Sequence, residues 1–287
     1  MTQRSAILSL LCIVVVALAG VYVLLPDTHT DETRARVSML DIGQGDSFLI
    51  DMSNGEQLLI DTGGSDGAVL QQLAEVMETG DRFIDVILIT HPDMDHVGGL
   101  VAILRRYDVG ALLTSEVSAH DDAFAPILSS AEKDGIPLYY VRKGTRIAFD
   151  HTGFAFLEIL FPDRDTTEWE TNTASAVSLL HLGEKKLLFM GDSPESIETF
   201  LRRSEPKIEN IDVLKLGHHG SNTSSSQAFL EYTHPKLALI SAGRNNRYGH
   251  PHQEVLDRLM KIGIPFVSTQ TAGTYTLITD GKQWFRQ

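Results

Sequence analysis

The sequence is almost devoid of cysteine. Its single cysteine, Cys12, lies in an apolar N-terminal stretch of the 287-residue chain. One thiol cannot form a disulfide within the chain, so the cysteine content does not indicate a redox compartment. Thiolate ligands are excluded from any metal site in the rest of the chain, and histidine, carboxylate or amide oxygen would have to hold the ion.

Basic residues are also in the minority. The chain carries 24 lysines and arginines against 38 acidic residues, a formal net charge of -14. A strongly acidic chain repels polyphosphate backbones at long range, so we expect no broad electrostatic contact with nucleic acid, although a local basic strip remains compatible with this balance. The hydrophobic content of 43% is typical of a globular protein with a sizeable core.

Long apolar runs are limited to one. The segment Ala6–Leu25 has no charged residue and no proline, and as a helix it would rise about 30 Å, enough to cross a bilayer. Arg4 precedes it and acidic residues follow, which favours the rest of the chain outside the cytoplasm. Residues 1–25 are therefore interpreted as an uncleaved anchor, with a cleaved signal peptide or a buried core helix as alternatives. The chain is expected to be membrane-anchored or secreted.

Residues 26–36 are polar and predict a short tether, and residues 37–287 predict one domain. Strand-like runs and helical patterns alternate there in two successive halves, which indicates an α/β (α+β) fold of two mixed sheets with helices outside. We expect strands at 37–41, 48–52, 58–61, 84–90, 111–114, 138–141, 146–149, 154–161, 176–182, 186–190, 211–216, 237–241, 266–268, 274–279 and 284–285, and helices at 68–78, 97–106, 194–203, 226–232 and 253–261.

Polar clusters directly follow five of these strands. Loops at strand ends are where functional sites are assembled on rigid scaffolds, so the clusters predict one shared site. They are Asp41–Asp46, Asp61–Gly64, His91–His96, Gly191-Asp192 and Gly217–Gly220.

The segment His91-Pro92-Asp93-Met94-Asp95-His96 places four potential metal ligands within six residues. A regular helix or strand could not turn all four toward one ion, but a loop can direct them toward two adjacent ions. A helix N-cap would account for one aspartate at most. Carboxylates clustered this closely are unfavourable without a cation, so the segment predicts a two-metal centre.

This segment resembles the H-x-[HD]-x-D-H signature of the metallo-β-lactamase-fold hydrolases. The loops around Asp41–Ser47, Ile60–Gly63 and Lys215–Ser221 are similar to one branch, which contains the extracellular hydrolase domain of ComEC-type competence proteins. The similarity extends over about residues 37–287. It implies a four-layer αββα sandwich with a binuclear site at one edge.

The resemblance also implies roles for individual residues. His91 and Asp93 would bind the first metal, Asp95 and His96 would bind the second, and Asp192 would bridge the two ions. Asp192 also precedes a helical pattern, so a helix N-cap is the alternative for this residue.

The histidines near the C-terminal end of the chain are harder to assign. Neighbouring strand residues point in opposite directions, so only one of His218 and His219 is expected to be a ligand unless the chain bends there. We assign His219 to the second metal and His218 to a nearby acid or supporting position. His250 competes with His219 for the ligand position and is otherwise a proton donor or substrate contact.

Two departures from the common family pattern affect the first metal. Asp93 stands where a histidine is usual, and Asn172 is nearest to the position where a further histidine is expected between His96 and Asp192. Oxygen ligands are harder donors than imidazoles. The cofactors are therefore predicted to be two divalent ions, Mn²⁺ or Zn²⁺, with Zn²⁺ held loosely.

The predicted activity is hydrolysis by a metal-bound hydroxide, with Asp95, His218 and His250 as the catalytic candidates. Two-metal geometry suits phosphodiester hydrolysis best, and the resemblance implies a nuclease because ComEC-type domains are associated with degrading one DNA strand during uptake. The expected substrate is a small molecule or polymer with a hydrolysable (phospho)ester, nucleic acid included. The alternatives are a hydrolase of a non-phosphate ester, amide or lactone, and a non-catalytic metal-binding interaction domain.

Overall fold

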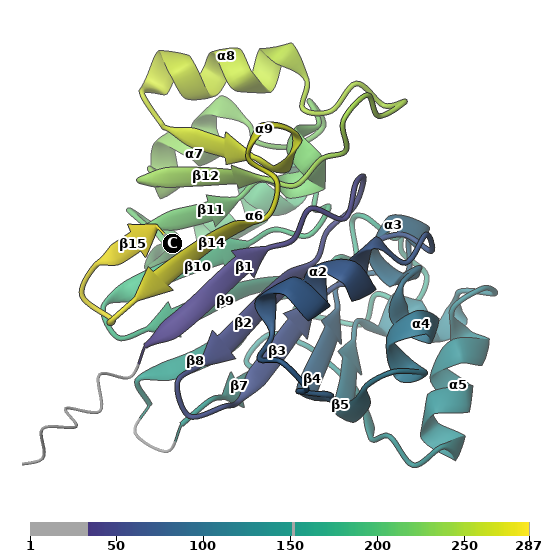
Figure 1. Ribbon diagram of the computed structural model, residues 1–287. Coiled ribbons are helices and arrows are strands. Elements are labelled where there is room, and N and C mark those ends of the chain that lie inside the picture. Colours follow the sequence, from purple (N-terminus) through teal and green to yellow (C-terminus); the bar gives the residue numbers. More distant parts are fainter. Residues whose placement is uncertain (1–33, 151–152, 287) are drawn as a thin grey trace, which may run out of the picture. The chain divides into compact units, whose positions relative to one another are not determined.

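Two mixed β-sheets form the framework of the protein in a computed structural model that describes residues 34–150 and 153–286 (Figure 1). The first sheet has the strand order β15-β14-β1-β2-β3-β4-β5-β6, and the second has the order β13-β12-β11-β10-β9-β8-β7. The strands of the first sheet are β1 (Ala35–Met39), β2 (Phe48–Met52), β3 (Gln57–Ile60), β4 (Phe83–Ile89), β5 (Asp108–Thr114), β6 (Leu138–Tyr140), β14 (Tyr275–Thr279) and β15 (Trp284–Arg286). Those of the second are β7 (Arg146–Ala148), β8 (Ala155–Phe161), β9 (Val177–Leu182), β10 (Lys185–Phe189), β11 (Val213–Lys215), β12 (Leu237–Ile240) and β13 (Phe266–Ser268).

Helices cover the outer face of each sheet. The first sheet packs against α2 (Ala68–Val76), α3 (Met94–Val97), α4 (Leu100–Leu104) and α5 (Ala125–Lys133), as Figure 1 shows. The second packs against α6 (Glu195–Ser204), α7 (Gln227–Thr233) and α8 (Gln253–Ile262). The short helix α9 (Thr269–Ala272) and the 3-10 helices η1 (Glu116–His120), η2 (Pro206–Ile208) and η3 (Gly217–Gly220) complete the described elements.

Three hydrophobic cores hold these layers together. The central core lies between the sheets, where the rings of Phe48 and Phe189 meet edge to face with centroids 5.2 Å apart. One outer core joins Leu59 of the first sheet to helix residues such as Leu73, and the other joins Leu214 of the second sheet to its own helices. The inward and outward faces of both sheets are therefore buried, which produces the predicted αββα sandwich.

Strand direction brings the polar loops to one edge of each sheet. Strand β1 is antiparallel to β2, β2 is antiparallel to β3, and β3 is parallel to β4, so β1, β3 and β4 run the same way. In the second sheet β10 is parallel to β11. The five polar loops identified in the sequence follow the carboxyl ends of these five strands, as predicted.

The helix predicted over residues 97–106 is instead divided into α3 and α4, and this prediction was wrong in its bounds. The division falls at Gly98-Gly99, where the chain passes close to the loop after β3. A Cβ atom at Gly99 would lie 2.2 Å from the carbonyl oxygen of Thr62, so only glycine permits this approach. Helices α5 and α9 were not predicted.

The N-terminal predictions fall mainly outside the described residues. The apolar segment Ala6–Leu25 is one of these, and strand β1 begins at Ala35, inside the range 26–36 for which a tether was predicted. Within residues 34–150 and 153–286, no helix has both the length and the apolar character needed to span a bilayer.

Candidate metal centre

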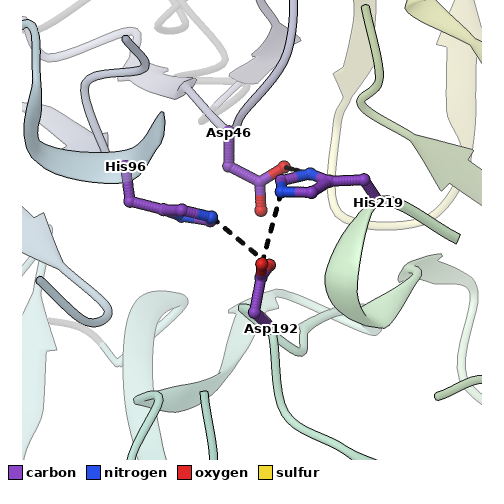
Figure 2. A group of neighbouring side chains, drawn as sticks. All are labelled: Asp46, His96, Asp192 and His219. Carbon is purple, nitrogen blue, oxygen red and sulfur yellow. Dashed lines mark ion pairs between the residues drawn. The ribbon is translucent and has the colours of Figure 1, made fainter. Parts of the chain in front are cut away.

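Asp192, in the loop after β10, lies at the focus of four histidines. Its carboxylate oxygens are 3.3 Å from Nε2 of His96 and 3.3 Å from Nε2 of His219, and Figure 2 shows these two rings approaching it from opposite sides. Nε2 of His218 is 3.7 Å away and Nε2 of His91 is 4.0 Å away. Asp192 is buried, as are His91, His96 and His219. This convergence joins loops from both sheets into one site.

His91 and His96 are oriented by contacts on the opposite side of each ring. Nδ1 of His96 lies 2.7 Å from a carboxylate oxygen of Asp61, and the Thr90 hydroxyl donates to the same oxygen at 2.8 Å. Because Thr90 uses its proton on Asp61, its oxygen accepts the Nδ1 proton of His91 at 3.0 Å. Both rings therefore direct Nε2 toward Asp192, the orientation that a metal ligand requires.

His219 is supported in a similar way from the second sheet. Its Nδ1 donates to the carbonyl oxygen of Ser241 at 3.0 Å and lies 3.3 Å from Oδ1 of Asp46. The other oxygen of Asp46 contacts the ammonium of Lys215, which is 3.9 Å from Asp192. Asp46 and Lys215 are both buried. Asp46 therefore lies on the Nδ1 side of the His219 ring, and Lys215 compensates its charge.

The chain bends sharply at the two adjacent histidines. His218 and His219 have φ of 48° and 54°, in the left-handed region, within the turn η3. This bend removes the strand geometry that predicted opposite side-chain directions, and both rings face Asp192. The side chain of His218 is 27% exposed against 1% for His219, and its Nδ1 lies 3.2 Å from the hydroxyl of Thr223.

Asp93 and Asp95 form a more open rim. Their side chains are 39% and 32% exposed. Asp95 lies 3.3 Å from Nε2 of His219, whereas Asp93 lies 3.8 Å from Nε2 of His91. The amide oxygen of Asn172 is buried and has no hydrogen-bond partner among the described residues, so it remains a candidate ligand.

The donor atoms of this centre fit a divalent cation. Nε2 of His91, His96 and His219 and Oδ1 of Asp192 are buried, and none has a hydrogen-bond partner within the described part of the chain. Buried polar atoms without partners are costly, and a metal ion would satisfy all of them together. Ligand atoms of Asp46, His96, Asp192 and His219 also lie within 4.8 Å of one another.

The electrostatics of the centre also favour bound positive charge. Burial lowers the pKa of His96 and of His219, but the carboxylates beside them, Asp192 foremost, raise both pKa values well above the usual range. Burial raises the pKa of Asp192, and the two histidines outweigh this effect and lower it. Burial and the neighbouring His96 lower the pKa of His91 to about 4. The carboxylates thus attract protons to the place where a metal would supply the charge.

His250 lies behind His218 and His219. Its ring centroid is 5.2 Å from that of His218, and its Nδ1 is buried without a hydrogen-bond partner in the described residues. Burial and the nearby His218 lower the pKa of His250 to about 4, so its imidazole is neutral at pH 7. Its part in catalysis stays a prediction.

The structure brings together the six residues predicted as metal ligands: His91, Asp93, Asp95, His96, Asp192 and His219. Their assignment to one ion or the other stays a prediction. Sequence reasoning missed the supporting residues Asp46, Asp61, Thr90 and Lys215. A signal was present, since Asp46 and Asp61 belong to the strand-end loops and Lys215 interrupts an otherwise apolar strand.

The sequence was compared with known proteins. It matches the family described as the metallo-beta-lactamase superfamily over residues 40–244. It is 30% identical over 84% of its length to ComE operon protein 3 of Bacillus subtilis, and 30% identical over 90% to competence protein ComA of Neisseria gonorrhoeae. The matched regions are 33% and 34% of those proteins, so the chain spans about a third of these curated relatives.

A comparison of structures agrees on the fold. The metallo-beta-lactamase fold protein YhfI from Bacillus subtilis superposes with a TM-score of 0.55 at 14% sequence identity. The match covers 85% of this chain and 99% of YhfI.

Proposed function

The chain belongs to the metallo-β-lactamase superfamily and is related to the ComEC-type competence proteins, and we propose that its metal centre hydrolyses phosphodiester bonds with the help of two divalent ions. The observation that carries this proposal is the convergence of four imidazoles on the buried carboxylate of Asp192. A carboxylate in this position suits a bridge between two cations, with histidines on both sides.

The two ions, Mn²⁺ or Zn²⁺, would supply an activated water at neutral pH and neutralise charge on the oxygens of the substrate. His91 and Asp93 would hold one ion, and His96, His219 and Asp95 would hold the other. This is the division that the resemblance implied, and it agrees with the short distances between Asp95 and His219 and between Asp93 and His91.

The remaining residues would orient the ligands and handle protons. Asp61 and Thr90 fix the rings of His96 and His91, so the metal-facing nitrogens are in place before metal binds. Asp95 is exposed enough to accept a hydrogen bond from the attacking water. His218, which is half-buried, is placed to donate a proton to the departing oxygen.

The location and substrate remain part of the proposal. With Ala6–Leu25 as anchor or signal, the domain would act outside the cytoplasm, membrane-anchored or secreted. The resemblance to ComEC-type hydrolase domains, which are associated with degrading one DNA strand during uptake, supports nucleic acid as the substrate. A small envelope phosphodiester is the other substrate of the same reaction class.

The proposal is tested by assaying the full chain with Mn²⁺ and with Zn²⁺ on bis-p-nitrophenyl phosphate, single- and double-stranded DNA, and a lactone. We expect metal-dependent hydrolysis of the diester and its loss in Asp95→Ala. Asp108→Ala is the matched control, because Asp108 is an exposed aspartate at the amino end of β5. Its activity should equal that of the unmodified protein.

The outcomes separate the alternative functions. Lactone hydrolysis without diester hydrolysis would replace the proposed reaction by that of an ester hydrolase. Stoichiometric metal binding without turnover on any substrate would indicate a metal-binding interaction domain. Full activity in Asp95→Ala would refute the site assignment.

A further inference from the structure

A cleft of about 680 Å³ opens beside the metal centre. Asp93, Met94 and Asp95 line one wall, and Arg247 and Tyr248 line another. The second wall belongs to the loop between β12 and α8, which Figure 1 shows near the end of α8. A substrate that reached the metal centre through this cleft would contact both walls.

The loop that carries Arg247 and Tyr248 is held rigidly at its base. The amide nitrogen of Asn246 donates to the carbonyl oxygens of Gly243 and His250 at 2.9 and 2.5 Å. Its amide oxygen accepts from the backbone nitrogens of Tyr248 and His250 at 3.1 and 3.0 Å. Gln270 donates to the same two carbonyl oxygens at 2.8 and 2.9 Å. These hydrogen bonds hold the base of the loop and so position Arg247 and Tyr248 at its tip.

Arg247 and Tyr248 form one unit at the tip. The guanidinium carbon of Arg247 lies 4.8 Å from the centre of the Tyr248 ring, and Nη2 donates to the phenol oxygen at 2.5 Å. Arg247 is the single lysine or arginine among the described residues lining the cleft, and the carboxylate of Asp95 interacts with it electrostatically. Tyr248 is 47% exposed. A cation and a large aromatic surface are thus displayed together.

We propose that Arg247 and Tyr248 recognise an unpaired nucleic-acid strand at this cleft, an inference that rests on the proposed phosphodiesterase function. The guanidinium would bind a phosphate beside the one being cleaved, and the tyrosine ring would stack on the adjoining base. Arginine suits phosphate because it presents several donors in a fixed plane, and base stacking on an aromatic ring needs an unpaired base.

The surrounding charge favours a single strand over a duplex. The cleft is lined by Asp93, Asp95 and Asp121 against the single cation of Arg247, and the whole chain has a net charge of -14. A duplex binds through an extended row of cations on its phosphates. A strand held by stacking and one phosphate contact needs far fewer, so the salt dependence of binding should be shallow.

The test compares a single-stranded oligothymidylate with the same strand carrying abasic sites, using the full chain and Mn²⁺. Tyr248→Ala should raise KM and Kd for the normal strand about tenfold and raise them much less for the abasic strand, because the abasic strand loses only the support that the tyrosine gives to Arg247. Tyr248→Phe keeps the ring and loses only the hydrogen bond from Arg247, so it should stay much closer to the unmodified protein than Tyr248→Ala. Tyr139→Ala is the matched control, since Tyr139 is an exposed tyrosine on β6 that does not line the cleft.

Arg247→Ala should weaken binding of both strands. It should also reduce the slope of log Kd against log salt concentration by about one, because one phosphate contact is lost. An equal effect of Tyr248→Ala on the normal and abasic strands would overturn the proposal. Preferred binding and cleavage of duplex DNA would overturn it as well.

The proposed function and this inference fail in different ways. Cleavage of bis-p-nitrophenyl phosphate with strand binding that ignores Tyr248 would leave the phosphodiesterase intact and refute the recognition pair. Absence of cleavage on every diester would refute the phosphodiesterase. Strand binding measured by fluorescence anisotropy would then test the recognition by Arg247 and Tyr248 separately. Binding of the normal strand that depends on Tyr248 would support the recognition, and binding that does not depend on Tyr248 would refute it.

Discussion

The deep side of the metal centre, where Asp61 and Asp46 lie behind His96 and His219, contrasts with the side around His91 and Asp93. Each deep histidine has a carboxylate on the far side of its ring, Asp61 for His96 and Asp46 for His219. His91 has a neutral hydroxyl there instead. Because a charged hydrogen-bond partner strengthens an imidazole as a ligand, the deep side should bind its ion more tightly. The two proposed metal positions are therefore expected to differ in affinity.

Removing the residue common to both sides should have the largest effect. Asp192→Asn takes away the charge on which the four imidazoles converge, so we expect loss of both ions and a fall in phosphodiesterase kcat of at least about 10³-fold. Mass spectrometry measures the loss of metal, and an assay of kcat measures the loss of activity. Asp93→Asn, which alters the rim alone, should retain one ion. Full metal content in Asp192→Asn would remove the basis for a bridging role.

Breaking the buried ion pair between Lys215 and Asp46 should lower the stability of the fold in addition to any effect on catalysis. Lys215→Met leaves Asp46 buried without its cation, and we expect a loss of about 3–5 kcal/mol in the free energy of unfolding. Denaturant titration measures the loss, and the added change Asp46→Asn should recover part of it. Lys236→Met is the control, because Lys236 is 72% exposed in its pair with Asp212. That variant should change stability by less than about 1 kcal/mol.

Changing the support of one ring should weaken metal binding without abolishing it. Asp61→Asn removes the charge next to His96, so we expect metal affinity to fall by about 10- to 100-fold. Thr90→Val removes the hydroxyl next to His91, which also donates to Asp61, so it should weaken the His91 side most and the His96 side less. Titration against a chromophoric chelator resolves the two sites. A larger loss at the tight site in Thr90→Val than in Asp61→Asn would reverse the proposed order of the two sides.

The smallest expected effect is on the free energy of unfolding, at Asp212, away from the metal centre. It distinguishes unfolding of the chain in acid from loss of metal in acid. Burial raises the pKa of Asp212, but hydrogen bonds from Lys236 and the backbone of Lys186 outweigh it and lower the pKa. A lowered pKa stabilises the fold above the unfolded-state pKa, and this stability is lost as pH falls through the folded pKa. Asp212→Asn should therefore destabilise by about 1–2 kcal/mol at neutral pH. The difference should shrink in acid, as denaturant titrations at both pH values would show, and a difference independent of pH would contradict this account.

Much of the framework could be predicted from the sequence because it depends on local patterns. The strands at 48–52 and 266–268 match the structure at both ends, and most other bounds differ by one to three residues. The break between α3 and α4 was missed because it depends on the approach of Gly99 to Thr62, which lies far away in the sequence. Helix α5 was missed because its apolar pattern is weak: Ser129 and Ser130 lie between its buried residues Leu128 and Ala131.

The sequence by itself determined which side chains could bind metal and that they follow strands, because clustered histidines and aspartates are costly without a cation. It also carried the family resemblance in those same loops. Only the tertiary structure decided how the ligands are supported, since Asp61, Asp46 and Lys215 reach the centre from segments that are distant in the sequence. The bend at His218 and His219 likewise depends on backbone angles that no strand pattern predicts. Ligand identity is local information, whereas ligand orientation depends on the packing of two sheets.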